Sequence, residues 1–357
     1  MKTMNAIKFL SEGTSTISLI KKSDFKSDYD ISLEYSYDGT NWNEWDFSGL
    51  TINSGDTLYI RGNNLSGFSS GPLAYYTFII EGDKVSCSGN IMSLINYTNT
   101  PNVIPNDYCF YGLFENCNAL TTAPELPAAE LKFACYSYMF YGCSSLTTAP
   151  ELPAMTLAKH CYGRMFSGCT SLTTAPELPA TELAEFCYRY MFKDCSSLTN
   201  APELPATRLA DGCYYRMFSG CTSLTTAPEL PASKLADYCY SYMFSECTSL
   251  INAPELPAMI LADYCYSYMF SNCSSLTTAP ALPATKLKAS CYDSMFSKCT
   301  ALTVAPELPA KNLAEWCYDG MFYGCTSLKD VPTELADNCF STFQDCIMLK
   351  DNKWTEF

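Results

Sequence analysis

Cysteine is the residue type in this chain whose spacing most suggests chemistry. One cysteine recurs every 26 residues from Cys109 to Cys317, and a second follows each of these after eight residues. A thiol becomes a strong nucleophile when a base lies beside it, and the single histidine, His160, directly precedes Cys161. Because Cys161 is one of nine equivalent cysteines, we interpret this pairing as coincidental and expect no catalytic residue.

The cysteines could also be metal ligands or disulfide partners. The chain has 21 cysteines and one histidine but no CxxC sequence, so the usual zinc ligand patterns are absent. We favour a ladder of buried thiols, because free cysteine behaves as a small hydrophobic residue. Disulfides between adjacent turns of the chain remain an alternative for a protein that lies outside cells.

Glutamate forms the second regular row. It occupies one position in successive repeats, and Ala281 interrupts the row: Glu125, Glu151, Glu177, Glu203, Glu229, Glu255 and Glu307. Carboxylate oxygens in a row would suit a cationic ligand or calcium, which is the one cofactor that we consider. The alternative, which we favour, is that each glutamate points to solvent or accepts backbone hydrogen bonds in a bend between two prolines.

A third row consists of tyrosines and arginines, each of which lies three residues after the first cysteine of its repeat. The row is Tyr138, Arg164, Tyr190, Arg216, Tyr242 and Tyr268, and it continues as Ser294 and Gly320. Tyrosine and arginine anchor many interfaces, so this row is a candidate recognition surface. An unconstrained solvent-facing row would vary in the same way, and we favour that interpretation. A further row of threonines, including Thr148 and Thr174, is typical of an exposed strand.

Two local patterns must position these rows. Leu131, Cys135, Tyr136, Met139, Phe140 and Cys143 have the spacing of one helix face, which predicts a short helix over 131–143 that ends near Gly142. The Thr-rich segment that follows predicts a short strand, limited by Pro150. Stacked copies of such a unit would form a solenoid with short parallel strands on one side.

The first part of the chain has a different pattern. Residues 1–82 contain no cysteine, and segments 31–42, 56–61 and 74–80 have the composition of strands, with a hairpin signal at Asp38-Gly39. We expect a small β-sandwich over residues 1–82 and a junction with an N-terminal cap over 83–108. The solenoid would span 109–338, followed by a C-terminal cap over 339–357. The fold class is therefore an α/β solenoid with a small all-β N-terminal domain.

The repeat resembles the leucine-rich repeats of the BspA-like class, which occur in bacterial surface proteins and in some phages of gut bacteria. One copy of the shared pattern consists of Cys169, Leu172, Ala175, Leu178, Pro179, Leu183, Met191, Phe192 and Cys195. The resemblance covers residues 109 to about 350, although 26 residues per repeat is longer than the roughly 23 usual in that class, within the range of leucine-rich repeats. It implies a surface-exposed binding or adhesion role and identifies no ligand.

The net charge and the hydropathy of the chain limit the classes of partner that it can bind. The net charge of −15 argues against nucleic acid, because phosphate binding requires clustered lysine and arginine. No segment has the roughly 18 apolar residues of a membrane span, and MKTMNAIKFLSEGTSTISLIKK shows no secretory signal. We predict a non-enzymatic recognition protein, extracellular or at the cell surface, whose repeats bind a host protein, a glycan or a cell surface. The alternative is a structural or receptor-binding part of a phage virion, such as a tail or fibre. The oligomeric state is left open.

Overall fold

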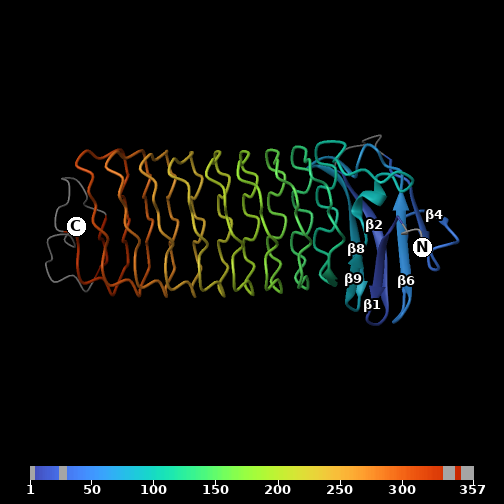
Figure 1. The fold of residues 1–357 in the computed structure, drawn as a ribbon. Helices are drawn as coiled ribbons and strands as arrows, with labels where there is room; N and C mark the ends of the chain where they lie inside the picture. Colours follow the sequence, from blue (N-terminus) through green and yellow to red (C-terminus); the bar gives the residue numbers. More distant parts are fainter. Residues whose placement is uncertain (1–4, 24–29, 333–341, 347–357) are drawn as a thin grey trace. The chain divides into compact units, whose positions relative to one another are not determined.

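The computed structural model describes residues 5–23, 30–332 and 342–346. The chain divides into two compact units, Met1–Leu178 and Pro179–Phe357, and each is described by itself. Figure 1 labels several strands of the first unit and shows the successive turns of the repeats that follow them. The first unit holds ten strands and one 3₁₀ helix: β1 (Ile7–Ser11), β2 (Ser15–Ser23), β3 (Leu33–Ser36), β4 (Asn43–Trp45), β5 (Leu50–Ile52), β6 (Thr57–Gly62), β7 (Ser69–Gly71), β8 (Ala74–Gly82), β9 (Val85–Ser88), η1 (Ile91–Leu94) and β10 (Leu120–Thr122).

The strands of the first unit form two sheets that pack face to face. One sheet has the order β10-β9-β1-β6-β3-β4 and the other β5-β2-β8-β7. The rings of Phe9 on β1 and Phe78 on β8 lie 5.6 Å apart between the sheets, and Trp45 stacks on Phe78 at 6.3 Å. The strands expected in 31–42, 56–61 and 74–80 are present as β3, β6 and β8, and β3 pairs antiparallel with β4 across Asp38-Gly39.

The β module merges into the first repeats of the same unit. Strand β10 belongs to the first repeat and pairs in parallel with β9, and the Ile91 N–H donates to the Glu125 carbonyl oxygen at 3.1 Å. Phe114, also in the first repeat, stacks on Phe78 at 4.9 Å between ring centroids. The β module therefore covers the apolar end of the repeats in this unit. Of the expected C-terminal cap over 339–357, only residues 342–346 are among those described.

The predicted helix over 131–143 is wrong. In this segment Met139 and Tyr141 donate backbone hydrogen bonds to carbonyls three residues earlier, whereas Tyr138, Phe140 and Gly142 donate to carbonyls in the next repeat at 2.8–2.9 Å. An α-helix would satisfy these groups internally, so it could not join the repeats. Consecutive turns replace the helix, and every fourth residue has a positive φ: 49° at Ala134, 59° at Tyr138 and 72° at Gly142.

The other side of each repeat is extended, but it contains less strand than expected. After β10, successive repeats are joined by isolated parallel bridges, such as Thr122 with Thr148 in the first unit and Thr226 with Asn252 in the second. A proline two residues after the bridge, such as Pro150 after Thr148, lacks an N–H, which limits each ladder to a single bridge. In the described residues the repeats of each unit therefore form a solenoid-like stack of turns with almost no helix, and the α/β description is not supported.

The core consists of identical side chains stacked between repeats. In the second unit the rings of Phe218, Phe244 and Phe270 stack at 5.7 Å and within 7° of parallel. The cysteines in the described part of the chain are buried thiols, which confirms the thiol ladder there. The second cysteine of a repeat donates its thiol proton to a phenylalanine carbonyl of the preceding repeat, as from Cys247 to Phe218 at 3.2 Å. Burial raises the pKa of thiols in both cysteine rows, to about 12 at Cys135 in the first and at Cys273 in the second.

Candidate binding surfaces

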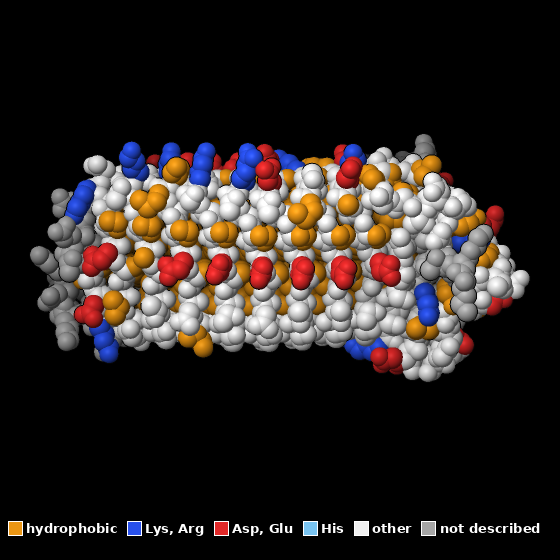
Figure 2. Space-filling view, viewed as in Figure 1, with side chains coloured by type: hydrophobic (Ala, Val, Ile, Leu, Met, Phe, Trp, Pro, Cys, Tyr) orange, Lys and Arg blue, Asp and Glu red, His pale blue; other side chains and the backbone are white. Residues whose placement is uncertain are grey.

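The seven glutamates, here named the glutamate stripe, are all exposed. Within each unit, Figure 2 shows acidic side chains in a line along one face of the repeats, beside a line of hydrophobic side chains. The neighbouring residue points inward: Leu152, next to Glu151, is 3% exposed. Among the described residues no hydrogen bond or ion pair engages the carboxylates of the stripe. The interpretation that these glutamates point to solvent is confirmed, whereas their role in binding stays a prediction.

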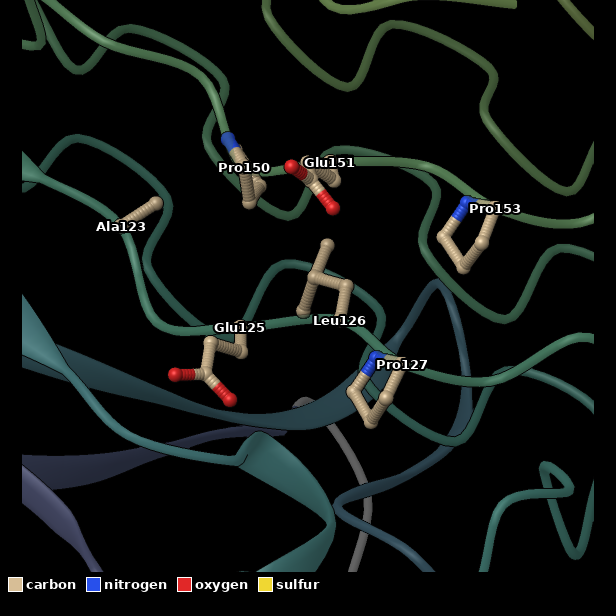
Figure 3. Close-up of a pocket in the computed structure, with 7 residues that line it drawn as sticks. All are labelled: Ala123, Glu125, Leu126, Pro127, Pro150, Glu151 and Pro153. Atoms are coloured by element: carbon tan, nitrogen blue, oxygen red, sulfur yellow. The ribbon is translucent and has the colours of Figure 1, made fainter. Parts of the chain in front are cut away.

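A shallow slot of about 500 Å³ lies between two neighbouring repeats of the first unit. Its walls combine two carboxylates of the stripe with prolines, and Figure 3 shows these side chains on two successive chain segments: Ala123, Glu125, Leu126, Pro127, Pro150, Glu151 and Pro153. Prolines offer an apolar surface to an alkyl stem, and the carboxylates can accept charge-assisted hydrogen bonds. The slot is therefore suited to a lysine or arginine side chain.

The tyrosine and arginine row is not an unconstrained solvent face. Its members have positive φ and are half-buried, because they pack on one another between repeats. In the second unit the Arg216 guanidinium lies 3.8 Å from the ring centroid of Tyr242, and the Tyr242 and Tyr268 rings stack at 4.5 Å and 3°. In the first unit Arg164 lies 5.6 Å from the Tyr138 ring. Tyr190 lies 5.4 Å from Tyr215, edge to face.

Beside this row the second unit has a hollow of about 390 Å³ that sequence reasoning missed. Its lining combines the end of the Tyr/Arg row with two rows nearer the second cysteine: Arg216, Tyr242, Ser245, Glu246, Tyr268, Ser271, Asn272, Ser294, Ser297, Lys298, Gly320 and Tyr323. The available signal was the run of serines at 245, 271 and 297, two residues before each second cysteine. Small residues at one position of stacked repeats leave a groove.

The remaining candidate chemistry is weak. The His160 ring packs edge to face on Phe133 at 5.6 Å, while burial raises the pKa of Cys161 well above its usual value. A neutral, buried thiol is a poor nucleophile, which supports the interpretation of this pair as coincidental.

The described residues contain no group of three or more His, Cys, Asp or Glu able to hold a metal ion, and calcium at the stripe stays a prediction. No helix in the described part is long and apolar enough to span a membrane.

Comparison with known families gives one result. A family model described as "BspA type Leucine rich repeat region (6 copies)" matches residues 104–227, 159–303, 212–329 and 263–355. These overlapping matches cover the repeats and leave out the β module. No curated protein and no solved structure matches the chain significantly.

Proposed function

Because the chain belongs to the BspA-type leucine-rich repeat family, we propose that it is a non-enzymatic recognition protein that binds a protein partner at a surface through its repeats. The family is generally non-enzymatic, typically surface-associated, and associated with surface protein binding or adhesion. The alternative of a phage virion component has no observation in its favour among the described residues and stays a prediction.

The glutamate stripe is the observation that carries the proposal. Adjacent turns joined by backbone hydrogen bonds lie about 5 Å apart, and two unit charges at that distance repel by roughly 1 kcal/mol in water. A partner that places cationic groups along the stripe would relieve this repulsion and form charge-assisted hydrogen bonds. Prolines beside the carboxylates supply apolar contact to the same partner.

The repeat spacing also indicates the shape of that partner. Residues on one face of an extended strand recur about every 6.7 Å, which falls out of register with turns about 5 Å apart. Successive turns of an α-helix recur every 5.4 Å or so, which stays close to register over several repeats. The stripe therefore fits a helical segment with lysine or arginine at every third or fourth position.

The test compares two triple variants of the full chain. The substitutions Glu203→Gln, Glu229→Gln and Glu255→Gln neutralise the stripe of the second unit, while Glu182→Gln, Glu185→Gln and Glu315→Gln remove the same charge at exposed positions outside it. The probes are intact epithelial and bacterial cells and a helical peptide with lysine at every fourth residue. We expect saturable, salt-sensitive binding that the stripe variant loses at least tenfold and the control keeps. Equal binding by the two variants would refute the proposal.

A further inference from the structure

The Tyr/Arg row of the second unit ends at an open ring face. Three side chains stack in successive repeats and are here named the tyrosine column: Arg216 lies on Tyr242, and Tyr242 stacks on Tyr268. The centroids of the two tyrosine rings lie 4.5 Å apart. The next two positions of the row hold Ser294 and Gly320, so no ring of the row follows Tyr268. A Cβ atom at Gly320 would lie 3.0 Å from the Ser294 hydroxyl oxygen, which shows that even the smallest side chain would narrow this space. The hollow therefore runs beside the column and continues past Tyr268 to Ser294 and Gly320.

The floor of the hollow carries hydroxyl groups without partners. Ser245 and Ser297 line it and are only 4% and 7% exposed. Among the described residues no hydrogen bond engages either hydroxyl, whereas the neighbouring Ser271 hydroxyl accepts one from the Asn272 amide at 3.2 Å. Neither oxygen is among the fully buried unpartnered atoms of the described residues, so both can be reached from the hollow, and a ligand that enters can form hydrogen bonds with them in place of water.

The rim of the hollow combines charges of both signs with a neutral amide. Glu246, Asn272 and Lys298 occupy one position in three successive repeats, one residue after the serines, and line the hollow. Donors and acceptors are therefore both present, and the rim has one charge of each sign. The third charge of the lining, the Arg216 guanidinium, already donates to the Tyr215 hydroxyl oxygen at 3.3 Å and lies on the Tyr242 ring. Such a rim suits a neutral ligand with many hydroxyl groups better than an acidic or a basic one.

We propose that this hollow binds a neutral pyranose residue of a glycan, with one face of the sugar ring stacked on Tyr268 and its hydroxyls bonded to the serine floor and the rim. The C–H groups on one face of a pyranose match the apolar face of a tyrosine ring. An aromatic side chain of a protein could stack there as well, but it would bury the Ser245 and Ser297 hydroxyls without partners. The volume of about 390 Å³ falls within the roughly 300–1,000 Å³ of small-molecule sites. This site goes beyond the proposed function, since it uses none of the glutamates of the stripe.

Ser294→Tyr is the decisive variant, because it extends the column by one ring into the hollow. Ser294 has a φ of 51°, and Tyr242 and Tyr268 adopt 56° at the equivalent positions, so the backbone accepts tyrosine there. Tyr268→Ala removes the stacking face instead. Tyr238→Ala is the matched control: it also removes one ring of a stacked pair, Tyr238 on Tyr264 at 4.7 Å, but that pair does not line the hollow.

The experiment is saturation-transfer NMR on the full chain with methyl glycosides of glucose, galactose, mannose and N-acetylglucosamine as probes. We expect at least one glycoside to bind, with affinity reduced at least tenfold in Ser294→Tyr and Tyr268→Ala and unchanged in Tyr238→Ala. The proposal is overturned if no glycoside shows saturation transfer, if Ser294→Tyr binds as the unmodified chain does, or if N-acetyltyrosine amide binds in the hollow and the sugars do not. If a variant of the hollow loses sugar binding and still binds cells, the hollow and the glutamate stripe act independently.

Discussion

Gly168→Ala separates a helix from the observed turns by the sign of its effect on stability. Gly168 has a φ of 79°. A Cβ atom there would meet nothing closer than the Gly142 Cα at 3.5 Å, an ordinary contact, so the cost is conformational alone. A left-handed conformation costs an L-residue roughly 1–2 kcal/mol. Alanine recovers about 0.4–1 kcal/mol by restricting the unfolded chain, and the net loss is about 1 kcal/mol. In a helix the same substitution would instead stabilise by about 1 kcal/mol.

Thermal unfolding followed by circular dichroism measures the difference. For a unit of 178 residues, a loss of 1 kcal/mol lowers Tm by about 2–4 °C. Gly168→Asn is the matched control, because Asn116 and Asn272 hold the equivalent position at φ of 60° and 62° and asparagine tolerates this conformation best after glycine. We expect the asparagine variant to lose less than half as much as the alanine variant. An alanine variant with a raised Tm would refute the turn structure.

Three further predictions concern the core and the stripe. Burial raises the pKa of the thiols, to about 12 at Cys273 and about 11 at Cys346, whereas a thiol of the unfolded chain titrates near 8.5. The buried neutral thiols therefore contribute their full share of folding stability below about pH 8.5, and this share is lost as the pH rises toward 12. Tm measured across that range should fall steadily. Glu229→Gln, with stripe neighbours on both sides, should raise Tm at low ionic strength more than Glu307→Gln, whose preceding position is Ala281, and a difference that persists in 1 M salt would contradict a charge effect. Tyr240→Phe removes a buried hydroxyl that has no hydrogen-bond partner, so urea unfolding should show a gain of about 1 kcal/mol rather than a loss.

The sequence predicted the parts of the fold that depend on composition and period. The 26-residue repeat predicted stacked turns, and its equivalent cysteines predicted a buried ladder, because a small apolar residue repeated at one core position packs on its own copies. The exposed direction of the glutamates followed from the cost of burying a row of like charges. The strands before residue 82 followed from alternation and from the Asp38-Gly39 turn signal.

Only the tertiary structure decided how the backbone of each turn is bonded. Cys135, Met139 and Cys143 recur every fourth residue, which satisfies one helix face and a run of four-residue turns equally well. The choice depends on whether alternate N–H groups bond within the segment or to the next repeat, as Phe140 does to Met165, and no single repeat contains that partner. The hollow beside Tyr268 arises in the same way, because it exists only where side chains of successive repeats come together. A repeat sequence determines which residues face inward, whereas the hydrogen bonds between neighbouring copies determine the local conformation and the surface that results.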